Sequence, residues 1–540
     1  MKSSNILSVK NLSVTIGNSS ILKNISFNLQ KNEILGVVGE SGSGKSITAF
    51  SIINLFNTNK IIKKGKVVFN NKRIDSISRA ELEKIRGTEI SIIFQEPMSS
   101  LNPSMKCGRQ VFEVLQTHNI SNNKENVVRV LDLFKKVKLK NPKSVYNKYP
   151  HELSGGQQQR IMIAIAIACN PKILIADEPT TSLDGIVKEK IISLLRKIQK
   201  ETKMSIIFVS HDLDLVSKFA KNIIVLNKGE IVEFGKSKKI FKYPENNYTK
   251  MLLESRPPRK GRPIRLPTIE NNLEKFTLVS QKKRSKKHQK IYNQNPILKV
   301  DKLCFSYNKK LVLNDINFKI YSGETLGLIG ESGSGKSTIA KCILNLHDYK
   351  RGDITYQNID IKKYDKKKFR RNIQLVFQDP FSSLNPEMSI GNSIIEPMIA
   401  HEIYKNDEER MLKACQLLED VGLDKNDFSK YPSQFSGGQR QRIVIARALS
   451  LNPRIVICDE SVSALDVSVQ AQVLNLLNSL KEKFTFTFLL ISHDLSVIRY
   501  MSDRVIILNK GTIEECNETD KVFENPIRHY TKQLLKANGF

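Results

Sequence analysis

Paired cysteines are missing from this chain of 540 residues. Its seven cysteines are scattered and none forms a Cys-x-x-Cys pair, which argues against a zinc site and a disulfide framework and fits a reducing, cytosolic setting. Long apolar runs are missing as well. The longest, residues 161–169, has nine residues, whereas a membrane-spanning helix needs about 20, and no signal peptide is visible. We therefore expect a chain that reaches a membrane only through partners.

Negative charge is scarce. The 54 acidic residues are outnumbered by 86 lysines and arginines, which gives a formal net charge of +32. Such an excess is compatible with a nucleic-acid or anionic-membrane partner, and also with lysine-rich solvated faces on a protein that binds anionic nucleotides. The charge is spread through both halves, without a helix-turn-helix or RNA-binding signature. We favour the second interpretation and expect no nucleic-acid partner.

The chain repeats itself, and the repeat defines its organisation. Gly39–Ser46 recurs 291 residues later as Gly330–Ser337, and four further landmarks recur 282 or 283 residues later in the same order. Those landmarks are Phe94-Gln95, Ser154–Gln157, Asp177-Glu178 and Ser210–Asp212. We therefore expect two related modules, at residues 6–254 and 297–540.

The segment between the modules, residues 255–296, is rich in proline, glycine and basic residues, as in RPPRKGRPIR at 256–265. Such a composition makes a poor hydrophobic core, so we expect a basic linker that serves as a solvated spacer. The alternative is a contact between this linker and anionic lipid or nucleic acid.

Short, continuous apolar runs mark the expected strands. They occupy residues 34–38, 173–176 and 205–209 in the first module and 325–329, 455–458 and 487–491 in the second. Runs of this kind, separated by helical patterns, indicate an α/β fold with a mostly parallel sheet covered on both faces. Helical patterns of mixed polarity at about 105–150 and 388–432 predict a separate helical subdomain in each module.

Each glycine-rich repeat reads Gly-x4-Gly-Lys-Ser, the Walker A pattern of phosphate-binding loops, and stands between an apolar run and a helical pattern, as that motif requires. Glycines let backbone N–H groups turn toward phosphates, and the following helix adds its positive N-terminal end. Lys45 and Lys336 would then reach the β- and γ-phosphates of a nucleotide, while Ser46 and Ser337 would hold Mg²⁺.

Asp177 and Asp459 each end an apolar run and are followed by a glutamate. An aspartate at this distance behind a Walker A loop can bind Mg²⁺ through water, and Glu178 or Glu460 would polarise the water that attacks the γ-phosphate. A plain helix cap is the alternative role for the Asp-Glu pair, and the preceding Walker A loop makes that alternative the weaker one.

The remaining landmarks resemble the motifs of ATP-binding cassette (ABC) proteins. Ser154–Gln157 and its repeat resemble the family's signature motif, Gln95 and Gln378 its Q-loop glutamine, His211 and His493 its switch histidine, and residues 182–184 and 464–466 its D-loop. The resemblance covers both modules. It implies two tandem P-loop NTPase (ABC ATPase) modules, each with a mostly parallel sheet core, an antiparallel β part and a helical subdomain. It also implies head-to-tail pairing, in which ATP lies between the Walker A loop of one module and the signature of the other.

The resemblance assigns residues to two composite ATP sites. Site one would combine Gly39, Ser41, Gly42, Gly44, Lys45, Ser46, Ile47, Gln95, Asp177, Glu178 and His211 with Ser436, Gly437, Gly438 and Gln439. Site two would combine Tyr307, Gly330, Ser332, Gly333, Gly335, Lys336, Ser337, Thr338, Gln378, Asp459, Glu460 and His493 with Ser154, Gly155, Gly156 and Gln157. The catalytic residues would be Glu178, Glu460, His211 and His493, and the Mg²⁺ ligands Ser46, Gln95, Asp177, Ser337, Gln378 and Asp459.

The adenine contact is expected to differ between the two sites. Tyr307 fits the position at which family members stack an aromatic ring on adenine, and the first module has Ile16 there. Because an aliphatic side chain lacks an aromatic face, site one is expected to hold adenine less well. Both catalytic glutamates are present, so we expect both sites to hydrolyse ATP.

Finer features resemble the ATPases of oligopeptide, dipeptide and nickel importers. They are the Q-loop continuations at 94–103 and 377–386 and the module ends at 243–253 and 525–535, which carry a Pro…Tyr-Thr-x-x-Leu-Leu tail. The resemblance implies two importer ATPases fused in one chain, at the cytoplasmic face of the bacterial inner membrane. Its partners would be two transmembrane permease subunits and, through them, a solute-binding protein. The sequence does not identify the solute.

Two other classes of tandem ATPase fit the sequence less well. A ribosome-binding ABC factor usually carries Asn-His-Leu-Asp at its D-loop, and that sequence is absent here. A DNA-repair ATPase would need zinc-binding cysteines or a long coiled-coil insertion, and the sequence shows neither.

Overall fold

The computed structural model describes residues 5–540 except 57–60, 121, 182, 269–276, 309, 378, 463 and 464. The chain forms two compact units, Met1–Leu183 with Val187–Leu253 and Asp184–Ile186 with Glu254–Phe540. The first unit holds the first predicted module. The second holds the second module together with the basic segment that precedes it.

The first unit contains two sheets and the helices that cover them. Its strands are β1 (Asn5–Ile16), β2 (Ser19–Gln30), β3 (Ile34–Val38), β4 (Ile61–Phe69), β5 (Lys72–Arg73), β6 (Ile90–Ile93), β7 (Ile173–Asp177), β8 (Ser205–Val209), β9 (Asn222–Asn227) and β10 (Glu230–Lys236). Its helices are α1 (Lys45–Ile52), α2 (Arg79–Ile85), α3 (Pro97–Ser100), α4 (Cys107–Thr117), α5 (Asn123–Lys136), α6 (Pro142–Tyr146), η1 (Pro150–Glu152), α7 (Gly155–Ile167), α8 (Gly185–Thr202), α9 (Leu213–Phe219), α10 (Ser237–Lys242) and α11 (Asn247–Glu254).

The second unit repeats this series after one additional helix, α12 (Gln281–Tyr292). Its strands are β11 (Leu298–Tyr307), β12 (Lys310–Ile320), β13 (Thr325–Ile329), β14 (Arg351–Tyr356), β15 (Ile359–Asp360), β16 (Ile373–Val376), β17 (Ile455–Asp459), β18 (Thr487–Ile491), β19 (Arg504–Asn509) and β20 (Thr512–Glu518). Its further helices are α13 (Lys336–Ile343), α14 (Lys366–Asn372), α15 (Pro380–Ser383), α16 (Ile390–Ala400), α17 (Asp407–Asp420), η2 (Lys425–Ser429), η3 (Pro432–Gln434), α18 (Gly437–Leu449), α19 (Val467–Phe484), α20 (Leu495–Met501), α21 (Thr519–Glu524) and α22 (His529–Ala537). Among the described residues, none of the chain's helices combines the length and apolarity needed to cross a membrane.

Both units have the predicted α/β sheet. In the first, six strands lie in the order β10-β9-β3-β8-β7-β6, and they are parallel except for the pairing of β9 with β10. In the second, the order is β16-β17-β18-β13-β19-β20, which is the same arrangement of equivalent strands listed from the opposite edge. All five residues of β7, β8, β13 and β18 are buried, which explains why their apolar runs are continuous. The predicted fold class is confirmed, including a smaller antiparallel sheet in each unit, β2-β1-β4-β5 and β12-β11-β14-β15.

One hydrophobic core joins the two sheets of the first unit. It contains Leu12 and Leu22 of the antiparallel sheet, Val37 of β3, Ile175 of β7 and Ala49 of α1. Helix α1 therefore packs into the same core as the strand that precedes it. As a result, the loop between β3 and α1 is anchored at both of its ends.

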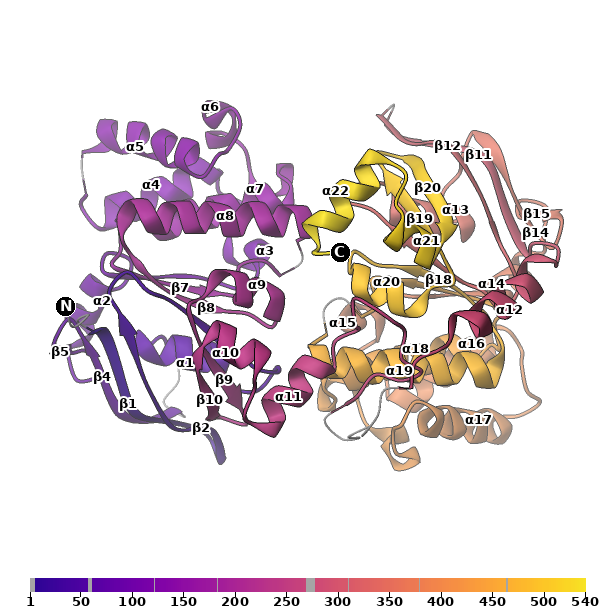
Figure 1. Cartoon of the computed structure of the whole chain (residues 1–540), viewed down its shortest axis with the longest axis horizontal. Helices are drawn as coiled ribbons and strands as arrows, with labels where there is room; N and C mark the ends of the chain where they lie inside the picture. The colour runs from indigo at the N-terminus through magenta and orange to yellow at the C-terminus, as the bar shows by residue number, and fades with distance from the viewer. Residues whose placement is uncertain are drawn as a thin grey trace. The chain divides into compact units, whose positions relative to one another are not determined.

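The expected helical subdomain is present in each unit. Val111 and Leu115 of α4 and Val130 and Phe134 of α5 are buried, and their spacing of four residues places them on one face of each helix. Figure 1 shows α4, α5 and α6 at the end of the first unit that lies away from β1, β2 and β4. Helices α16 and α17 with η2 repeat the arrangement.

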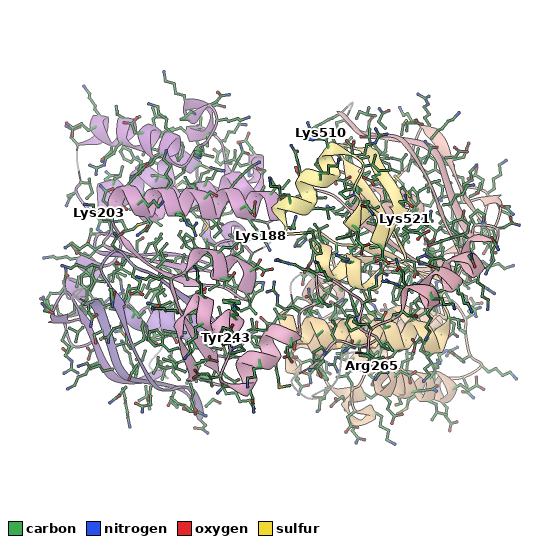
Figure 2. All side chains as sticks on the ribbon, in the orientation of Figure 1. Lys188, Lys203, Tyr243, Arg265, Lys510 and Lys521 are labelled. Atoms are coloured by element: carbon green, nitrogen blue, oxygen red, sulfur yellow. The ribbon has the colours of Figure 1, made fainter. Side chains whose placement is uncertain are left out.

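The positive charge lies largely on solvated side chains. Lys203, Lys510 and Lys521, all labelled in Figure 2, are exposed. Exposed lysines are compatible with both interpretations of the net charge.

The basic segment does not form the solvated spacer that its composition suggested. Arg262 is buried and its guanidinium donates to the carbonyl of Ser502 at 2.6 Å. Leu266 is buried within the core of the second unit, and its backbone N–H and C=O both pair with the Asn475 side chain, at 2.8 and 2.7 Å. Helix α12 then follows, with His288 buried. The expectation was wrong because a few anchoring side chains are enough to hold a segment that is otherwise polar.

Acidic groups of the second module explain where this segment packs. Lys287 of α12 donates to both carboxylate oxygens of the buried Asp503, at 2.8 and 3.0 Å, and Arg284 donates to Asp520 at 3.3 Å. The equivalent residues of the first module, 282 positions earlier, are Lys221 and Lys238. Because the charge has the opposite sign there, the basic segment complements only the second module.

Candidate functional site

The Walker A loops are placed by the strand that precedes each one and the helix that follows. In the first module β3 ends at Val38 and α1 begins at Lys45. The last loop residue, Gly44, has φ +102°, and a Cβ there would lie 2.5 Å from Leu22. Gly335 of the second module has φ +108° under the same restriction from Leu313. Only glycine fits a position that combines a left-handed backbone with so close a neighbour.

The Walker A lysines point back into their own loops. Lys45 Nζ donates to the carbonyls of Gly39 and Glu40 at 2.9 and 2.8 Å. Lys336 is buried like Lys45, and its Nζ makes the equivalent bonds at 2.8 and 3.0 Å. Burial lowers the pKa of Lys336, and the nearby carboxylates oppose that shift. Each loop thus carries a buried cation inside a turn lined by backbone groups, the arrangement that phosphate binding needs.

The two aspartates lie where a metal ion could bind. Asp177 ends β7 and lies beside Ser46 at the start of α1, and burial raises its pKa to about 6. Asp459 lies beside Ser337 in the same way, and burial also raises its pKa. Within the described part of the chain, Oδ1 of each aspartate is buried without a hydrogen-bond partner. A carboxylate and a hydroxyl side by side, with one orphaned oxygen, suit Mg²⁺ completed by phosphate oxygens and water.

The glutamates that follow have an unusual backbone. Glu178 and Glu460 have φ +48° and +49°, in the left-handed region that costs a residue with a Cβ about 1–2 kcal/mol. In the first module Glu178 Oε2 accepts hydrogen bonds from Gln95 Nε2 at 3.2 Å and Thr181 Oγ1 at 2.9 Å, and it lies 3.0 Å from His211 Nδ1. The structure therefore gathers the predicted Q-loop glutamine, glutamate and histidine at one carboxylate.

Electrostatics keep the Glu178 carboxylate ionised. Its burial opposes ionisation, but the hydrogen bond and charge of His211, together with the charge of Lys45, hold the pKa of Glu178 below its usual value. In the second module His493 Nδ1 lies 3.3 Å from Glu460 Oε2. Gln378, the predicted Q-loop glutamine there, lies outside the described residues, as do Ser182 and Ala464 of the two D-loops.

The signature motifs form helix starts. Ser154 and Ser436 are exposed and stand immediately before α7 and α18. The backbone N–H of each serine donates to the glutamine three residues later, Gln157 at 3.1 Å and Gln439 at 3.0 Å. This reciprocal cap closes the first helical turn, and it leaves the serine hydroxyl on the surface of the module.

The other predicted phosphate-site residues lie in the Walker A loops or in the first turn of the helix that follows. They are Ser41, Gly42 and Ile47 in the first module and Ser332, Gly333 and Thr338 in the second.

Tyr307, the predicted adenine contact, lies in an aromatic cluster. Its ring is 43% exposed and packs edge-on against Phe305, with the centroids 4.7 Å apart. Its hydroxyl hydrogen-bonds His347 Nε2, and the His347 ring stacks on Phe305 at 5.0 Å. Sequence reasoning missed His347 and Thr181 because no motif spacing marks either residue.

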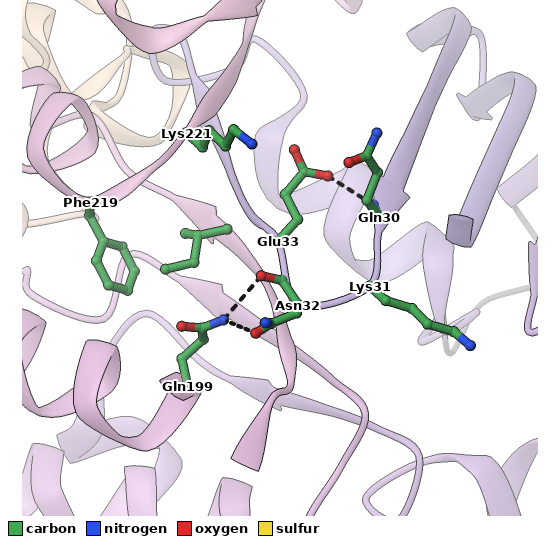
Figure 3. A pocket seen from close by; sticks show the side chains of 8 residues that line it. Gln30, Lys31, Asn32, Glu33, Gln199, Phe219 and Lys221 are labelled. Carbon is green, nitrogen blue, oxygen red and sulfur yellow. Dashed lines mark hydrogen bonds between the residues drawn. The ribbon is translucent and has the colours of Figure 1, made fainter. Parts of the chain in front are cut away.

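A cavity of about 240 Å³ lies elsewhere in the first module and is shown in Figure 3. It is lined by Gln30, Lys31, Asn32, Glu33, Ile34, Gln199, Phe219 and Lys221, and by none of the predicted site residues. Glu33 and Ile34 stand at the beginning of β3, whereas the Walker A loop follows the end of that strand. Ligands of parallel sheets bind at the carboxyl ends of the strands, so this cavity is not the phosphate site.

Family comparisons agree with the geometry. The model of the ABC transporter family matches residues 22–181 and 313–463. The model described as the C-terminal region of oligopeptide/dipeptide transporters matches residues 232–284, which include all of α10 and α11 and the start of α12.

Several curated proteins resemble the chain along nearly its whole length. Glutathione import ATP-binding protein GsiA of Escherichia coli O157:H7 is 39% identical, over 99% of this chain and 89% of that protein. The protein of the same name from Shigella dysenteriae serotype 1 matches with the same identity and coverage.

Solved structures match one cassette at a time. The post-hydrolysis dimeric structure of the ATP-binding cassette MJ0796 bound to ADP and Pi is 32% identical, over 43% of this chain and 98% of that chain, with a TM-score of 0.39. The structure of cbiO1 from Clostridium perfringens is 26% identical, over 43% and 92%, with a TM-score of 0.40. The family model finds both modules and the relatives span the whole chain, so this protein belongs to the ABC transporter family, as an ATPase with two ATP-binding cassettes.

Proposed function

We propose that this chain is the ATP-hydrolysing subunit that energises an importer of peptides or related small solutes at the cytoplasmic face of a bacterial inner membrane. The observation that carries the proposal is the match of residues 232–284 to the C-terminal region of oligopeptide/dipeptide transporters, in a chain with two cassettes. The glutathione-import relatives support it. Its partners would be two permease subunits and, through them, a solute-binding protein. The relatives named above are import proteins and do not support the ribosome-factor alternative.

The side chains of the first module suit ATP hydrolysis. Lys45 and the loop N–H groups would bind the phosphates, and Ser46 and Asp177 would hold Mg²⁺, which supplies positive charge to the phosphoryl oxygens. Glu178, kept ionised, would accept a hydrogen bond from the attacking water and orient it. His211 would contact the γ-phosphate. The same roles fall to Lys336, Ser337, Asp459, Glu460 and His493 in the second module.

We further propose the family's composite arrangement, in which each ATP is completed by the signature of the other module. The exposed helix starts at Ser154 and Ser436 support it, because the N-terminal end of a helix favours an anion such as a γ-phosphate. A double-mutant cycle tests it, since residues of one site act non-additively. Ser436→Arg should add little loss of ATPase activity to Glu178→Gln, and should abolish the activity left in Glu460→Gln. Equal additional losses in the two backgrounds would refute the composite arrangement.

The transport role is tested in cells that lack this gene and depend on peptide uptake. The wild-type chain should restore uptake of a radiolabelled dipeptide or glutathione and should fractionate with membranes. A chain carrying Lys45→Ala and Lys336→Ala should fractionate in the same way without restoring uptake. Restoration by the double variant, or fractionation with ribosomes instead of membranes, would contradict the proposal.

A further inference from the structure

A tyrosine near the end of each cassette has no role in the chemistry described so far. Tyr248 lies in α11 and Tyr530 in α22, 282 residues later, each within the Tyr-Thr-x-x-Leu-Leu tail. Each of these helices is the last element of its module and is remote in sequence from the Walker A loop.

In the first module this tyrosine reaches the phosphate-binding loop. Tyr248 is 9% exposed, and its hydroxyl accepts a hydrogen bond of 3.2 Å from the backbone N–H of Glu40, 208 residues earlier. Glu40 is the second residue of the Walker A loop. Lys45 donates to the carbonyls of Gly39 and Glu40 from within the loop. The first peptide groups of the loop are therefore held from two sides.

The second module repeats the placement without completing the bond. Burial raises the pKa of Tyr530 to about 12, and the Glu331 backbone lies beside its hydroxyl. Glu331 occupies the loop position that Glu40 occupies in the first module. Among the described residues, the Tyr530 hydroxyl is buried and lacks a partner in hydrogen-bond geometry. The same residue type thus meets the same loop position in both copies.

We propose that Tyr248 is a positioning residue for ATP binding, which holds the start of the Walker A loop in the conformation that receives phosphate. Gly39, Gly42 and Gly44 give this loop a large conformational freedom, and an anchor outside the loop reduces the entropy lost when a ligand orders it. Tyr530 occupies the equivalent position in the second module, and we assign the same role to it. The inference rests on the proposed phosphate site.

The test is Tyr248→Phe in the full chain, in a Lys336→Ala background that leaves the first Walker A loop to bind nucleotide. The variant removes one hydroxyl and keeps the ring. The affinity for ATP and for inorganic tripolyphosphate should each fall about threefold to tenfold, as expected for one neutral hydrogen bond. The KM for ATP should rise with kcat nearly unchanged, because fewer molecules hold a binding-competent loop. If Tyr248 instead contacted the adenine base, the variant would weaken the binding of ATP but not of tripolyphosphate. If the variant simply lost structure, kcat and the melting temperature would fall.

The matched control is Tyr243→Phe in the same module, because Tyr243 is 63% exposed and labelled in Figure 2. It should leave both affinities unchanged. Wild-type affinities in Tyr248→Phe would overturn the inference. Wild-type ATP binding in the double variant Lys45→Ala, Lys336→Ala would instead overturn the phosphate site itself, so the two failures are distinguishable.

Discussion

His211 Nδ1 lies 3.0 Å from Glu178 Oε2, and the equivalent histidine and glutamate of the second module lie 3.3 Å apart. The switch histidine is thus engaged with the glutamate that would orient the attacking water. A hydrogen bond at Oε2 leaves Oε1 available to a water molecule. The pairing recurs in both modules, which supports the proposed catalytic arrangement.

Both glutamates should be needed for full ATPase activity. Glu178→Gln and Glu460→Gln each remove a carboxylate, and loss of a positioned base typically lowers the rate at its site about 10²–10⁴-fold. Steady-state phosphate release by the full chain should fall in each single variant and nearly vanish in the double. If one single variant keeps full activity, the site of the substituted glutamate does not contribute to ATP hydrolysis.

Tyr307 should contribute to nucleotide affinity at the second module through its ring. Tyr307→Ala, in a Lys45→Ala background, should weaken ATP binding about threefold to tenfold, since an aromatic contact is worth about 0.5–1.5 kcal/mol. Calorimetric titration with tripolyphosphate, which has no base, should show no change. Conversely, Ile16→Tyr should tighten ATP binding at the first module. Equal losses for ATP and tripolyphosphate in Tyr307→Ala would show that the ring acts on the loop and not on adenine.

Asp503 should make the second module sensitive to acid. Its burial opposes ionisation, yet His288, whose Nε2 lies 3.6 Å from Asp503 Oδ1, and the charges of Lys481 and Lys287 hold its pKa far below the usual value. A depressed folded-state pKa contributes stability above the unfolded-state pKa of about 3.9, and that stability is lost as the pH falls toward the folded-state value. Asp503→Asn should therefore lower the free energy of unfolding at pH 7 by about 3–5 kcal/mol and flatten its dependence on pH below about 5.

Urea unfolding of the full chain, followed by circular dichroism at several pH values, measures both effects. Asp301→Asn is the control, because Asp301 pairs with Lys299 on a partly exposed strand. It should leave the acid transition in place. An unchanged pH dependence in Asp503→Asn would contradict the assignment.

The basic segment should stabilise the second module. Leu266→Ala should lower its unfolding free energy by about 2–5 kcal/mol, the usual cost of emptying a buried leucine site. Lys282→Ala, on an exposed position of α12, should have no measurable effect in the same denaturation experiment. A solvated spacer would tolerate both substitutions equally.

The sequence determined the fold class and most of the chemistry. Repeated motifs placed the Walker A loops, Asp177, Glu178 and His211, because these functions depend on local patterns such as a strand, a turn and a helix in succession. The strands at 34–38 and 325–329 were located correctly, since buried parallel strands read as short apolar runs. The helical subdomains were predicted from the helical patterns at about 105–150 and 388–432, and the second signature from the repeat.

Only the tertiary structure decided what residues distant in sequence do together. The hydrogen bond that the Glu40 N–H donates to Tyr248 and the one between Tyr307 and His347 have no local signature, because each joins separate elements. Composition misjudged the basic segment for the same reason. In the sequence, Arg284 and Lys287 look like solvated charges, but in the fold they pair with Asp520 and Asp503. In the first module, a lysine occupies the position equivalent to each of these two aspartates. A charge is solvated or paired according to what the chain folds against it, and that is a property of long-range packing.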